Sequence, residues 1–381
     1  MPYNIMIADD YDINRNLIKV ILQNKIDGVN FFEAENGLHV MKIISDTDID
    51  LIILDLVMPE KDGFQVLKEI KRNDRYKEIP IIVNSSLEDM DSVQRALKHG
   101  ALDYFTKPLT NNEINITLPL KVKNALKYYE QRKLLVGLNS KMKGELEFAR
   151  LFQSSLMAEA KIVDLAELYG RYLPCNSIGG DMYDYIKVGD KLWFIIADVC
   201  GHGVVAAMLS SMIKVIFNNF IQYLSSPKEV LENLNIIFCN ILGEDNNLFF
   251  SAFVGLIQGE RLSYSNAGHY YPMIIDTRAG TLKMLEQKGL LIGIIKDAKY
   301  ENSEDILKAD ECIVAFTDGL FDTGSKEYLE DWDKVYETSL KFAELLKYDP
   351  VKFMDTLIKS VNGAAQDEFR DDVTVMIIKI K

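Results

Sequence analysis

Short apolar runs alternate with longer amphipathic stretches over residues 1–120 of the chain. The apolar runs predict five strands, over Asn4–Ala8, Val29–Phe32, Asp50–Leu54, Ile79–Val83 and Asp103–Thr106. Apolar residues at helical spacing between these runs predict helices, among them Asp12–Asn24, Asp62–Lys71 and Leu87–His99. Strands that alternate with helices form a parallel sheet with helices on both faces, and functional groups gather at the carboxyl ends of the strands. We therefore expect an α/β domain with a five-stranded parallel sheet.

The pattern becomes helical over residues 121–160. Apolar side chains spaced three or four residues apart form one seam: Leu135, Leu138, Met142, Ala149, Phe152 and Leu156, with Glu145 as the exception. Such a seam is typical of a helix that pairs with another helix. We expect a helical linker that joins two copies of the chain as a coiled-coil homodimer. A helix that packs only on its own chain is the alternative.

Residues 161–381 combine β-rich segments and turns with helical stretches near Val204–Tyr223, Pro227–Leu242 and Asp331–Ser360. Strands and helices that are grouped rather than alternating predict an α+β domain. A chain of 381 residues is long enough for these two domains and the linker between them.

Composition restricts the partners and the compartment. The chain has 43 Lys and Arg against 57 Asp and Glu, and its net charge of −14 opposes binding to nucleic acid. Its four cysteines include no CxxC pair, a usage that fits a reducing compartment. No apolar run is long enough to span a membrane, and the first residues lack the pattern of a secretion signal. We expect a cytoplasmic protein that binds neither nucleic acid nor membranes.

Three carboxylates lie at the ends of predicted strands in the first domain. Asp9 and Asp10 follow the first strand and Asp55 follows the third, so all three should meet at one edge of the sheet. Acids this close repel one another unless a cation lies among them, and Mg²⁺ prefers oxygen ligands. We expect Mg²⁺ to be held by these carboxylates and by the main-chain carbonyl of Val57.

The same edge offers the groups needed for phosphoryl transfer. Asp55 is a carboxylate that can accept a phosphoryl group as a nucleophile. Lys107, after the fifth strand, would be a fixed cation on that group, and Ser85, after the fourth, would bind a phosphate oxygen and move its loop. Taken singly, Asp9-Asp10 and Lys107-Pro108 are more typical of ordinary loops and turns than of a site. Their order on successive strand ends favours a site.

Four motifs in this order, IADD, DLVMPEKDG, IIVNSS and DYFTKP, resemble the response-regulator receiver domain. The resemblance implies a flavodoxin-like fold, with Asp55 as phosphoacceptor, Ser85 as switch hydroxyl, Tyr104 as switch aromatic residue and Lys107 as the family's lysine. It also implies a sensor histidine kinase or a phosphotransfer protein as phosphodonor. Ser86 stands where alanine is usual, a departure that leaves this chemistry intact.

Aspartates also lie where strands meet turns in the second domain: Asp181, Asp198, Asp318, Asp371 and Asp372. Zinc is a poor match, because Cys200 and His202 lack the spacing of a site with four nitrogen or sulfur ligands. Carboxylates and carbonyls instead suit Mg²⁺ or Mn²⁺. Two such ions bridged by one aspartate would lower the pKa of a water and direct it at phosphorus, which predicts phosphomonoester hydrolysis. Neighbouring glycines would let the main chain approach the ions.

The motifs IGGDMYD, IADVCGHG, SNAGH, FTDG and RDDVT resemble the metal-dependent protein phosphatase (PPM) family. Their nearest branch is the bacterial stage II sporulation protein E type, which acts on phosphoserine or phosphothreonine of anti-sigma-factor antagonists. The resemblance implies an α-β-β-α sandwich and two Mn²⁺ or Mg²⁺ ions. Asp181, Asp198 and the Val199 carbonyl would bind both ions, and Asp318 and Asp371 would complete the shell of one.

Further residues of these motifs would lie beside the ions or the substrate: Gly180, Gly201, His202, Asn266, His269 and Asp372. Asp372 would support the ligands, and Asn266 and His269 would shape the adjoining loop. We interpret His202 as a hydrogen-bonding residue of a glycine turn and Cys200 as a small buried apolar residue.

We expect a response regulator whose output is a Mg²⁺- or Mn²⁺-dependent serine/threonine phosphatase that phosphorylation of Asp55 controls. The substrate would be a phosphorylated regulatory protein of the anti-sigma-factor antagonist type. The first alternative is a catalytically silent adaptor with the same two folds that binds a sigma-factor regulator. The intact aspartates oppose it, because an adaptor needs none of them. The second, a transcription factor, conflicts with the net charge of −14.

Overall fold

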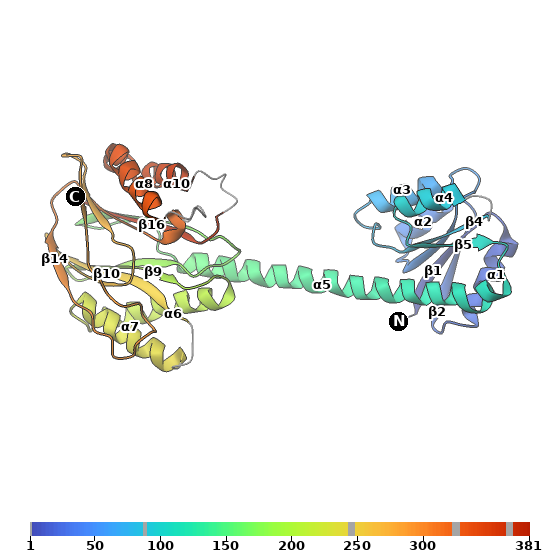
Figure 1. Cartoon of the computed structure of the whole chain (residues 1–381), viewed down its shortest axis with the longest axis horizontal. Helices are drawn as coiled ribbons and strands as arrows, with labels where there is room; N and C mark the ends of the chain where they lie inside the picture. The colour runs from blue at the N-terminus through green and yellow to red at the C-terminus, as the bar shows by residue number, and fades with distance from the viewer. Residues whose placement is uncertain (1, 87–89, 243–247, 322–327, 363–368) are drawn as a thin grey trace. The chain divides into compact units, whose positions relative to one another are not determined.

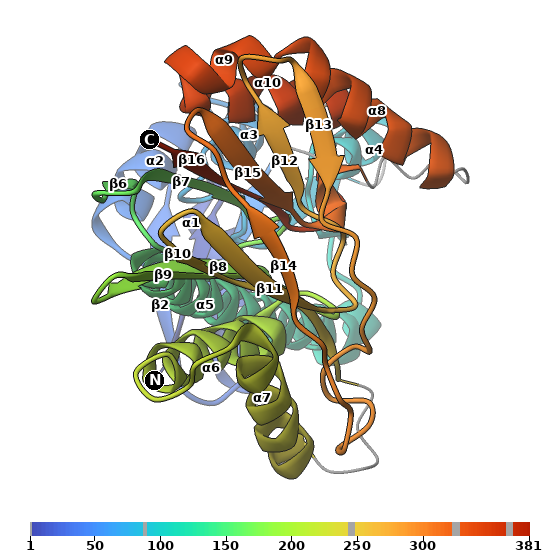
Figure 2. The ribbon, with the colours of Figure 1, turned by 90° about the vertical axis from the view of Figure 1, so that its left-hand side faces the viewer.

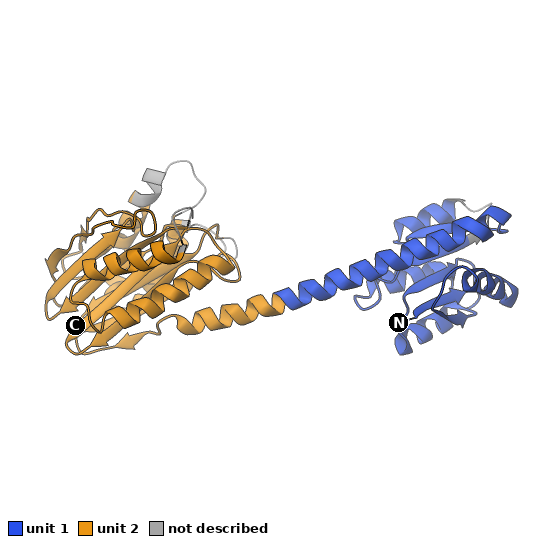
Figure 3. Cartoon of the chain, turned by 90° about the horizontal axis from the view of Figure 1, so that it is seen from below, with its two compact units in different colours: residues 1–142 blue, residues 143–381 orange. Residues whose placement is uncertain are grey.

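The computed structural model describes residues 2–86, 90–242, 248–321, 328–362 and 369–381. The chain forms two compact units, residues 1–142 and residues 143–381, shown in blue and orange in Figure 3. Each unit has its own hydrophobic core.

The first unit is built on a parallel sheet with the strand order β2-β1-β3-β4-β5 (Figure 1). Its strands are β1 (Tyr3–Ala8), β2 (Val29–Ala34), β3 (Leu51–Asp55), β4 (Ile81–Ser86) and β5 (Asp103–Lys107). Its helices are α1 (Asp12–Gln23), α2 (Gly37–Asp46), α3 (Gly63–Arg72) and α4 (Met90–Lys98). Helices α2, α3 and α4 contribute to the core on one face, and α1 and the start of α5 (Leu118–Leu156) to the core on the other. The predicted five-stranded parallel α/β fold is confirmed.

Helix α5 follows a short π-helical turn, η1 (Glu113–Thr117), and is 39 residues long. Its first turns pack on the sheet through Leu118, Val122, Ala125 and Leu126. Several residues of the predicted seam are exposed further along it, with 60% of Leu135, 49% of Leu138, 58% of Met142 and 57% of Phe152 accessible. The seam therefore lies on a surface that the described residues of this chain leave largely uncovered.

The second unit contains two antiparallel sheets packed face to face. One has the order β14-β11-β10-β9-β8 and the other the order β13-β12-β15-β16-β7-β6. The strands of the first sheet are β8 (Met182–Val188), β9 (Lys191–Val199), β10 (Phe250–Gln258), β11 (Arg261–Ala267) and β14 (Ser303–Ile306). Those of the second are β6 (Lys161–Ile162), β7 (Ala166–Leu173), β12 (Met273–Asp276), β13 (Thr281–Met284), β15 (Glu311–Phe316) and β16 (Val373–Ile380). Phe194 and Phe253 from the first sheet meet Ile313 and Met376 from the second in the core between them.

Helices cover both outer faces of this pair of sheets (Figure 2). Helices α6 (Val204–Phe220) and α7 (Pro227–Leu242) pack on the first sheet, and α8 (Tyr328–Lys341), α9 (Ala343–Tyr348) and α10 (Pro350–Asn362) on the second. The predicted α-β-β-α sandwich is confirmed. The helical region expected over Asp331–Ser360 consists of three helices, and Pro350, which cannot continue a preceding helix, begins the last of them.

Among the described helices, none is both long enough and apolar enough to cross a membrane.

Candidate functional site

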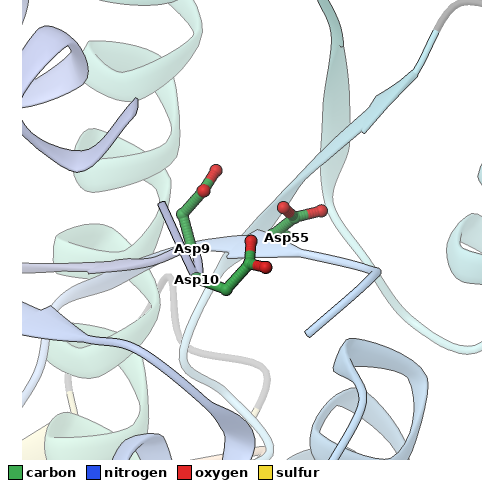
Figure 4. Close-up of side chains that lie close together, drawn as sticks. All are labelled: Asp9, Asp10 and Asp55. Atoms are coloured by element: carbon green, nitrogen blue, oxygen red, sulfur yellow. The ribbon is translucent and has the colours of Figure 1, made fainter. Parts of the chain in front are cut away.

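The carboxylates of Asp9, Asp10 and Asp55 meet at one edge of the first unit's sheet (Figure 4). Strands β1 and β3 are neighbours with Ala8 opposite Leu54, so the residues that follow on each strand lie side by side. One oxygen from each carboxylate lies within 4.8 Å of the others. Asp9 is 1% exposed and Asp55 is 6% exposed. The expected acidic edge is therefore present and largely withdrawn from water.

Lys107 bridges two of these acids. Its Nζ donates to Asp9 Oδ2 at 2.7 Å and to Asp55 Oδ2 at 2.6 Å. Burial raises the pKa of Asp55, although the hydrogen bond from Lys107 opposes that shift. Burial alone would lower the pKa of Lys107, but its bonds to Asp55 and Asp9 outweigh burial and raise it. The lysine thus compensates part of the acidic charge from within the protein.

The site formed by Asp9, Asp10 and Asp55 can bind a metal cation in addition to Lys107. Asp10 Oδ1 is buried and has no hydrogen-bond partner among the described residues. A buried carboxylate oxygen without a donor is costly, and a divalent ion is the natural partner for it. Asp9 is held in place by the main-chain N–H of Tyr11 at 3.0 Å and by Asn14 Nδ2 at 2.9 Å, two contacts that the sequence did not reveal. The donor set fits Mg²⁺.

The remaining predicted residues of the first unit lie around this edge. Val57 follows β3, and its N–H donates to Asp55 Oδ1 at 3.2 Å. Tyr104 lies on β5, with Lys121 Nζ 4.9 Å from the centre of its ring. Ser85 lies on β4 with Thr106 opposite it, but its side chain is outside the described part of the structure.

Strand pairing in the second unit brings its aspartates to one end of the two sheets. Asp181 precedes β8 and Asp198 lies near the end of β9, and the pairing of Met182 with Ala197 places these two acids next to each other. Asp318 begins the 3-10 turn η2 (Asp318–Leu320) after β15, and Asp371 precedes β16, the partner of β15. Four strands of two sheets therefore deliver one carboxylate each.

The aspartates at this end of the two sheets repel one another, and this repulsion contributes to their raised pKa values. Burial, followed by the charges of Asp318 and Asp371, raises the pKa of Asp198 to about 7. Burial and then the charge of Asp198 raise the pKa of Asp181. In the described residues, these acids do not gather as tightly as Asp9, Asp10 and Asp55 do. Mutual repulsion of this kind is what a divalent cation relieves, and the all-oxygen donor set fits Mg²⁺ or Mn²⁺.

Asp372 holds the loop that precedes β8 through hydrogen bonds to its main chain. It is 2% exposed, and its two oxygens accept from the N–H of Gly180 at 2.6 Å and from the N–H of Cys175 at 2.9 Å. A Cβ on Gly179 would lie 1.9 Å from Asp372 Oδ2, and a Cβ on Gly180 would lie 2.5 Å from the carbonyl oxygen of Val199. These glycines allow the loop to pass directly over the end of β9.

The glycine turn after β9 differs from expectation at one residue. Gly201 and Gly203 have φ values of 88° and 89°, which favour glycine. His202 is exposed, and its Nδ1 lies 3.3 Å from Asn176 Nδ2. The prediction that Cys200 is buried is wrong: the side chain is exposed because it lies in the turn where the chain leaves the sheet.

Asn266 and His269 shape a buried loop. Asn266 Oδ1 accepts from the His269 N–H at 2.7 Å, and Asn266 Nδ2 donates to the His269 carbonyl at 2.8 Å. His269 Nδ1 lies 2.8 Å from Ser251 Oγ, and Ser251 is the residue opposite Asp198 on β10. Burial lowers the pKa of His269 to about 3, so the ring is neutral at physiological pH.

Gln153 is a contact that our sequence interpretation missed. This residue lies near the end of α5 and is 4% exposed. Its Nε2 donates to the Gly179 carbonyl at 2.7 Å and to Ser210 Oγ of α6 at 3.2 Å, and its Oε1 accepts from the Gly179 N–H at 3.3 Å. Helix α5 is thereby bonded directly to the loop that carries Asp181. In the sequence, the only indication of this contact was a polar residue, Gln153, next to the apolar seam residue Phe152.

A buried ion pair also braces this edge. Asp184 on β8 is 3% exposed and lies 2.5 Å from Lys214 Nζ of α6. Burial raises the pKa of Asp184, and the bond from Lys214 opposes the shift. The pair joins α6 to the strand that follows Asp181.

Comparisons with known proteins agree with this geometry. Residues 188–381 match the model of the family Stage II sporulation protein E (SpoIIE), and residues 5–118 match that of the response regulator receiver domain. The chain belongs to the SpoIIE family. It therefore combines a receiver domain with a metal-dependent protein phosphatase domain of the SpoIIE type, as the motifs predicted.

Individual curated relatives match parts of this SpoIIE-family chain. Phosphoserine phosphatase RsbU of Bacillus subtilis (strain 168) is 27% identical over 266 residues, which are 66% of this chain and 75% of RsbU. Phosphoserine phosphatase RsbP of the same organism is 27% identical over 194 residues, 50% of this chain and 48% of RsbP. Chemotaxis protein CheY of Halobacterium salinarum (strain ATCC 29341 / DSM 671 / R1) is 34% identical over 108 residues, 28% of this chain and 87% of CheY.

A solved structure supports the fold of the SpoIIE-family domain. The SiaA-PP2C domain of Pseudomonas aeruginosa superposes with a TM-score of 0.54 at 19% identity, over 64% of this chain and 99% of that domain.

Proposed function

We propose that this chain is a two-component response regulator whose output is phosphoprotein hydrolysis. Residues 1–120 would form the receiver, residues 121–160 the linker and residues 161–381 the phosphatase. The observation that carries the proposal is the half-buried carboxylate of Asp198, which is surrounded by acids from three other strand ends. The substrate would be phosphoserine or phosphothreonine on a regulatory protein such as an anti-sigma-factor antagonist, in the cytoplasm.

In the receiver, Asp55 accepts the phosphoryl group from a sensor histidine kinase or a phosphotransfer protein. Mg²⁺ held by Asp9, Asp10, Asp55 and the Val57 carbonyl supplies positive charge to the transferring group when it is bound. Lys107 is already within 2.6 Å of Asp55 and offers its proton to the same oxygens. Ser85 and Tyr104 transmit the change to the rest of the domain.

In the phosphatase, Asp181, Asp198 and the Val199 carbonyl hold two Mn²⁺ or Mg²⁺ ions, and Asp318 and Asp371 complete the shell of one. Bound ions of this kind neutralise the phosphate and lower the pKa of a water molecule. Thr317 Oγ1 donates to Asp181 Oδ2 at 2.6 Å and fixes that carboxylate. Asp372 fixes the Gly180 loop, while Gly201, His202, Asn266 and His269 shape the surrounding turns.

The linker connects the two activities through a homodimer. The exposed seam on α5, which includes Leu135, Leu138 and Met142, supports pairing with a second copy, because isolated apolar stripes of this kind are costly in water. Gln153 supports a route from α5 to the metal loop, since it bonds Gly179 directly. A change in helix pairing would then alter the position of Asp181.

Turnover of p-nitrophenyl phosphate with and without Mn²⁺ tests the enzymatic activity. Asp198→Ala should lower metal-dependent turnover by more than about 100-fold, because it removes the carboxylate nearest to the others. Asp190→Ala, in the exposed β8–β9 turn where Asp190 accepts from Gln258 at 2.7 Å, is the matched control. Wild-type protein that shows no metal-dependent turnover would contradict the proposal and favour the adaptor.

Phosphorylation control is tested separately with Asp55→Asn. Treating the wild type with a small acyl phosphate and Mg²⁺ should change its phosphatase rate. The amide of the substituted side chain cannot accept the phosphoryl group, so the variant should keep the untreated rate. An equal response in both proteins would contradict control through Asp55.

A further inference from the structure

A cavity of about 590 Å³ lies where the chain passes from the first sheet of the phosphatase domain to the second. Tyr270 and Tyr271, between β11 and β12, form one wall, and Gln287 and Lys288, after β13, form another. Tyr270 is 37% exposed, so an aromatic face is open to a partner. None of these four residues is used by the chemistry described above.

Two chains of contacts join this cavity to the catalytic edge. His269 lines the cavity and bonds Ser251, the cross-strand neighbour of Asp198. On the other side, the ring of Tyr270 lies 4.9 Å from that of Phe321, whose N–H donates to the carbonyl of Asp318 at 2.9 Å. The cavity is therefore connected through Ser251 of β10 to β9, and through Phe321 to the turn after β15, which carry two of the candidate ligands.

Gln287 lines this cavity and is anchored beside it. The residue is 9% exposed, and its Nε2 donates to the Glu301 carbonyl at 2.7 Å. Its Oε1 is buried and accepts no hydrogen bond from any described residue. Because this oxygen is enclosed and the amide nitrogen is bonded to Glu301, Gln287 forms a fixed wall of the cavity.

A second cavity, of about 560 Å³, continues from the first through Tyr271 and Lys288. Glu286, Asp333 and Glu337 line it together with Lys288. In the described residues, none of these four charged side chains forms a salt bridge. Three carboxylates against one lysine leave this surface negative, so it attracts a positively charged group.

We propose that the two cavities bind the polypeptide segment that flanks the phosphorylated residue of the substrate, and that they select a segment with basic side chains. The segment lies against Tyr270 and Tyr271 and directs a lysine or arginine at Glu286, Asp333 and Glu337. This specificity rests on the proposed phosphatase function. It predicts a preference that a small phosphate ester, which has no flanking segment, does not show.

A pair of synthetic phosphoserine peptides tests this preference. Both have the same length, and one carries arginines and the other glutamates at the flanking positions. The wild type should hydrolyse the arginine peptide with a kcat/KM at least about five-fold higher, and most of the difference should lie in KM. The double variant E286Q/E337Q should lose this preference while it keeps the wild-type turnover of p-nitrophenyl phosphate.

E260Q/E304Q is the matched control, because it removes two charges from the same domain at glutamates that line neither cavity. This control should keep the preference for arginine. Equal kcat/KM for the two peptides, or no hydrolysis of either, would overturn the inference if p-nitrophenyl phosphate is still hydrolysed with Mn²⁺. Absence of metal-dependent hydrolysis of p-nitrophenyl phosphate would instead contradict the phosphatase function itself.

Discussion

The receiver and the phosphatase each bring several carboxylates together, and the two sites differ in what compensates the negative charge. In the receiver, Lys107 lies between Asp9 and Asp55 and compensates their charge from within the protein. In the phosphatase, neither Asp181 nor Asp198 forms a salt bridge to a described residue, and burial, followed by repulsion from neighbouring acids, raises the pKa of both. The receiver edge therefore carries its own cation, whereas the phosphatase edge depends on cations from solution.

Metal removal should separate the two sites most strongly. The folded-state pKa of Asp198, about 7, is above its ordinary value, so the metal-free protein loses stability as pH rises from about 4 to about 7. Mn²⁺ at 100 times its Kd would stabilise the protein by about 2.7 kcal/mol. The increase in Tm on adding Mn²⁺ should be larger at pH 8 than at pH 5, where protons already neutralise the acid.

Differential scanning calorimetry of the full chain in EDTA and in Mn²⁺ measures this difference. Asp198→Asn provides the control, because an amide carries no charge to titrate and should flatten the pH dependence of the metal-free protein. If the gain in Tm on adding Mn²⁺ were the same at pH 5 and pH 8, the phosphatase site would not depend on added cations to compensate its charge, and the difference from the receiver site would be contradicted.

Lys107→Met tests whether Lys107 compensates the acidic charge of the receiver site. It leaves the carboxylates of Asp9 and Asp55 facing each other without their cation, and should destabilise the receiver by about 1–3 kcal/mol in the absence of Mg²⁺. Mg²⁺ should restore part of the loss, because the variant then depends on an external cation as the phosphatase does. Urea unfolding with and without Mg²⁺ measures both effects.

Lys121→Met is the matched control for that substitution, because Lys121 forms a more exposed ion pair with Asp103 in the same domain. Its loss should cost less, and Mg²⁺ should not restore it. Equal behaviour of the two variants would show that Lys107 is not the internal cation of the site.

The smallest effect is expected at Gln153. Gln153→Leu removes the bonds to Gly179 and Ser210, and the resulting displacement of the metal loop should lower turnover of p-nitrophenyl phosphate about 10-fold, equivalent to ~1.4 kcal/mol. Higher Mn²⁺ should recover part of the activity, and the Tm of the variant in EDTA should stay close to that of the wild type, whereas general destabilisation would lower it. Gln131→Leu, on an exposed turn of the same helix, should have no effect.

Sequence reasoning succeeded where a local pattern determines the structure. Asp9, Asp55 and Lys107 each follow an apolar run, and parallel pairing necessarily brings such strand ends together. The layered phosphatase fold likewise follows from its motifs and from the order of its elements. What the sequence predicted less well depends on contacts between distant segments.

Gln153 and Cys200 illustrate that limit. The glutamine lies 26 residues before the glycine that it bonds, and its role appears only when α5 packs beside that loop. Cys200 has the apolar character of a core residue, but the main chain turns outward after β9 and carries it to the surface. The side chain of Ser85 lies outside the described residues, so its predicted switch role stays a prediction.

The adjacent residues Asp371 and Asp372, just before β16, should differ in which substitutions they tolerate. Asp371 takes part in the acidic edge, whereas both oxygens of Asp372 are already engaged by main-chain donors. The space beside Asp372 is closed, since even a Cβ on Gly179 would lie 1.9 Å from it. A library built on this Asp-Asp pair should therefore recover longer acids at the first position and reject them at the second.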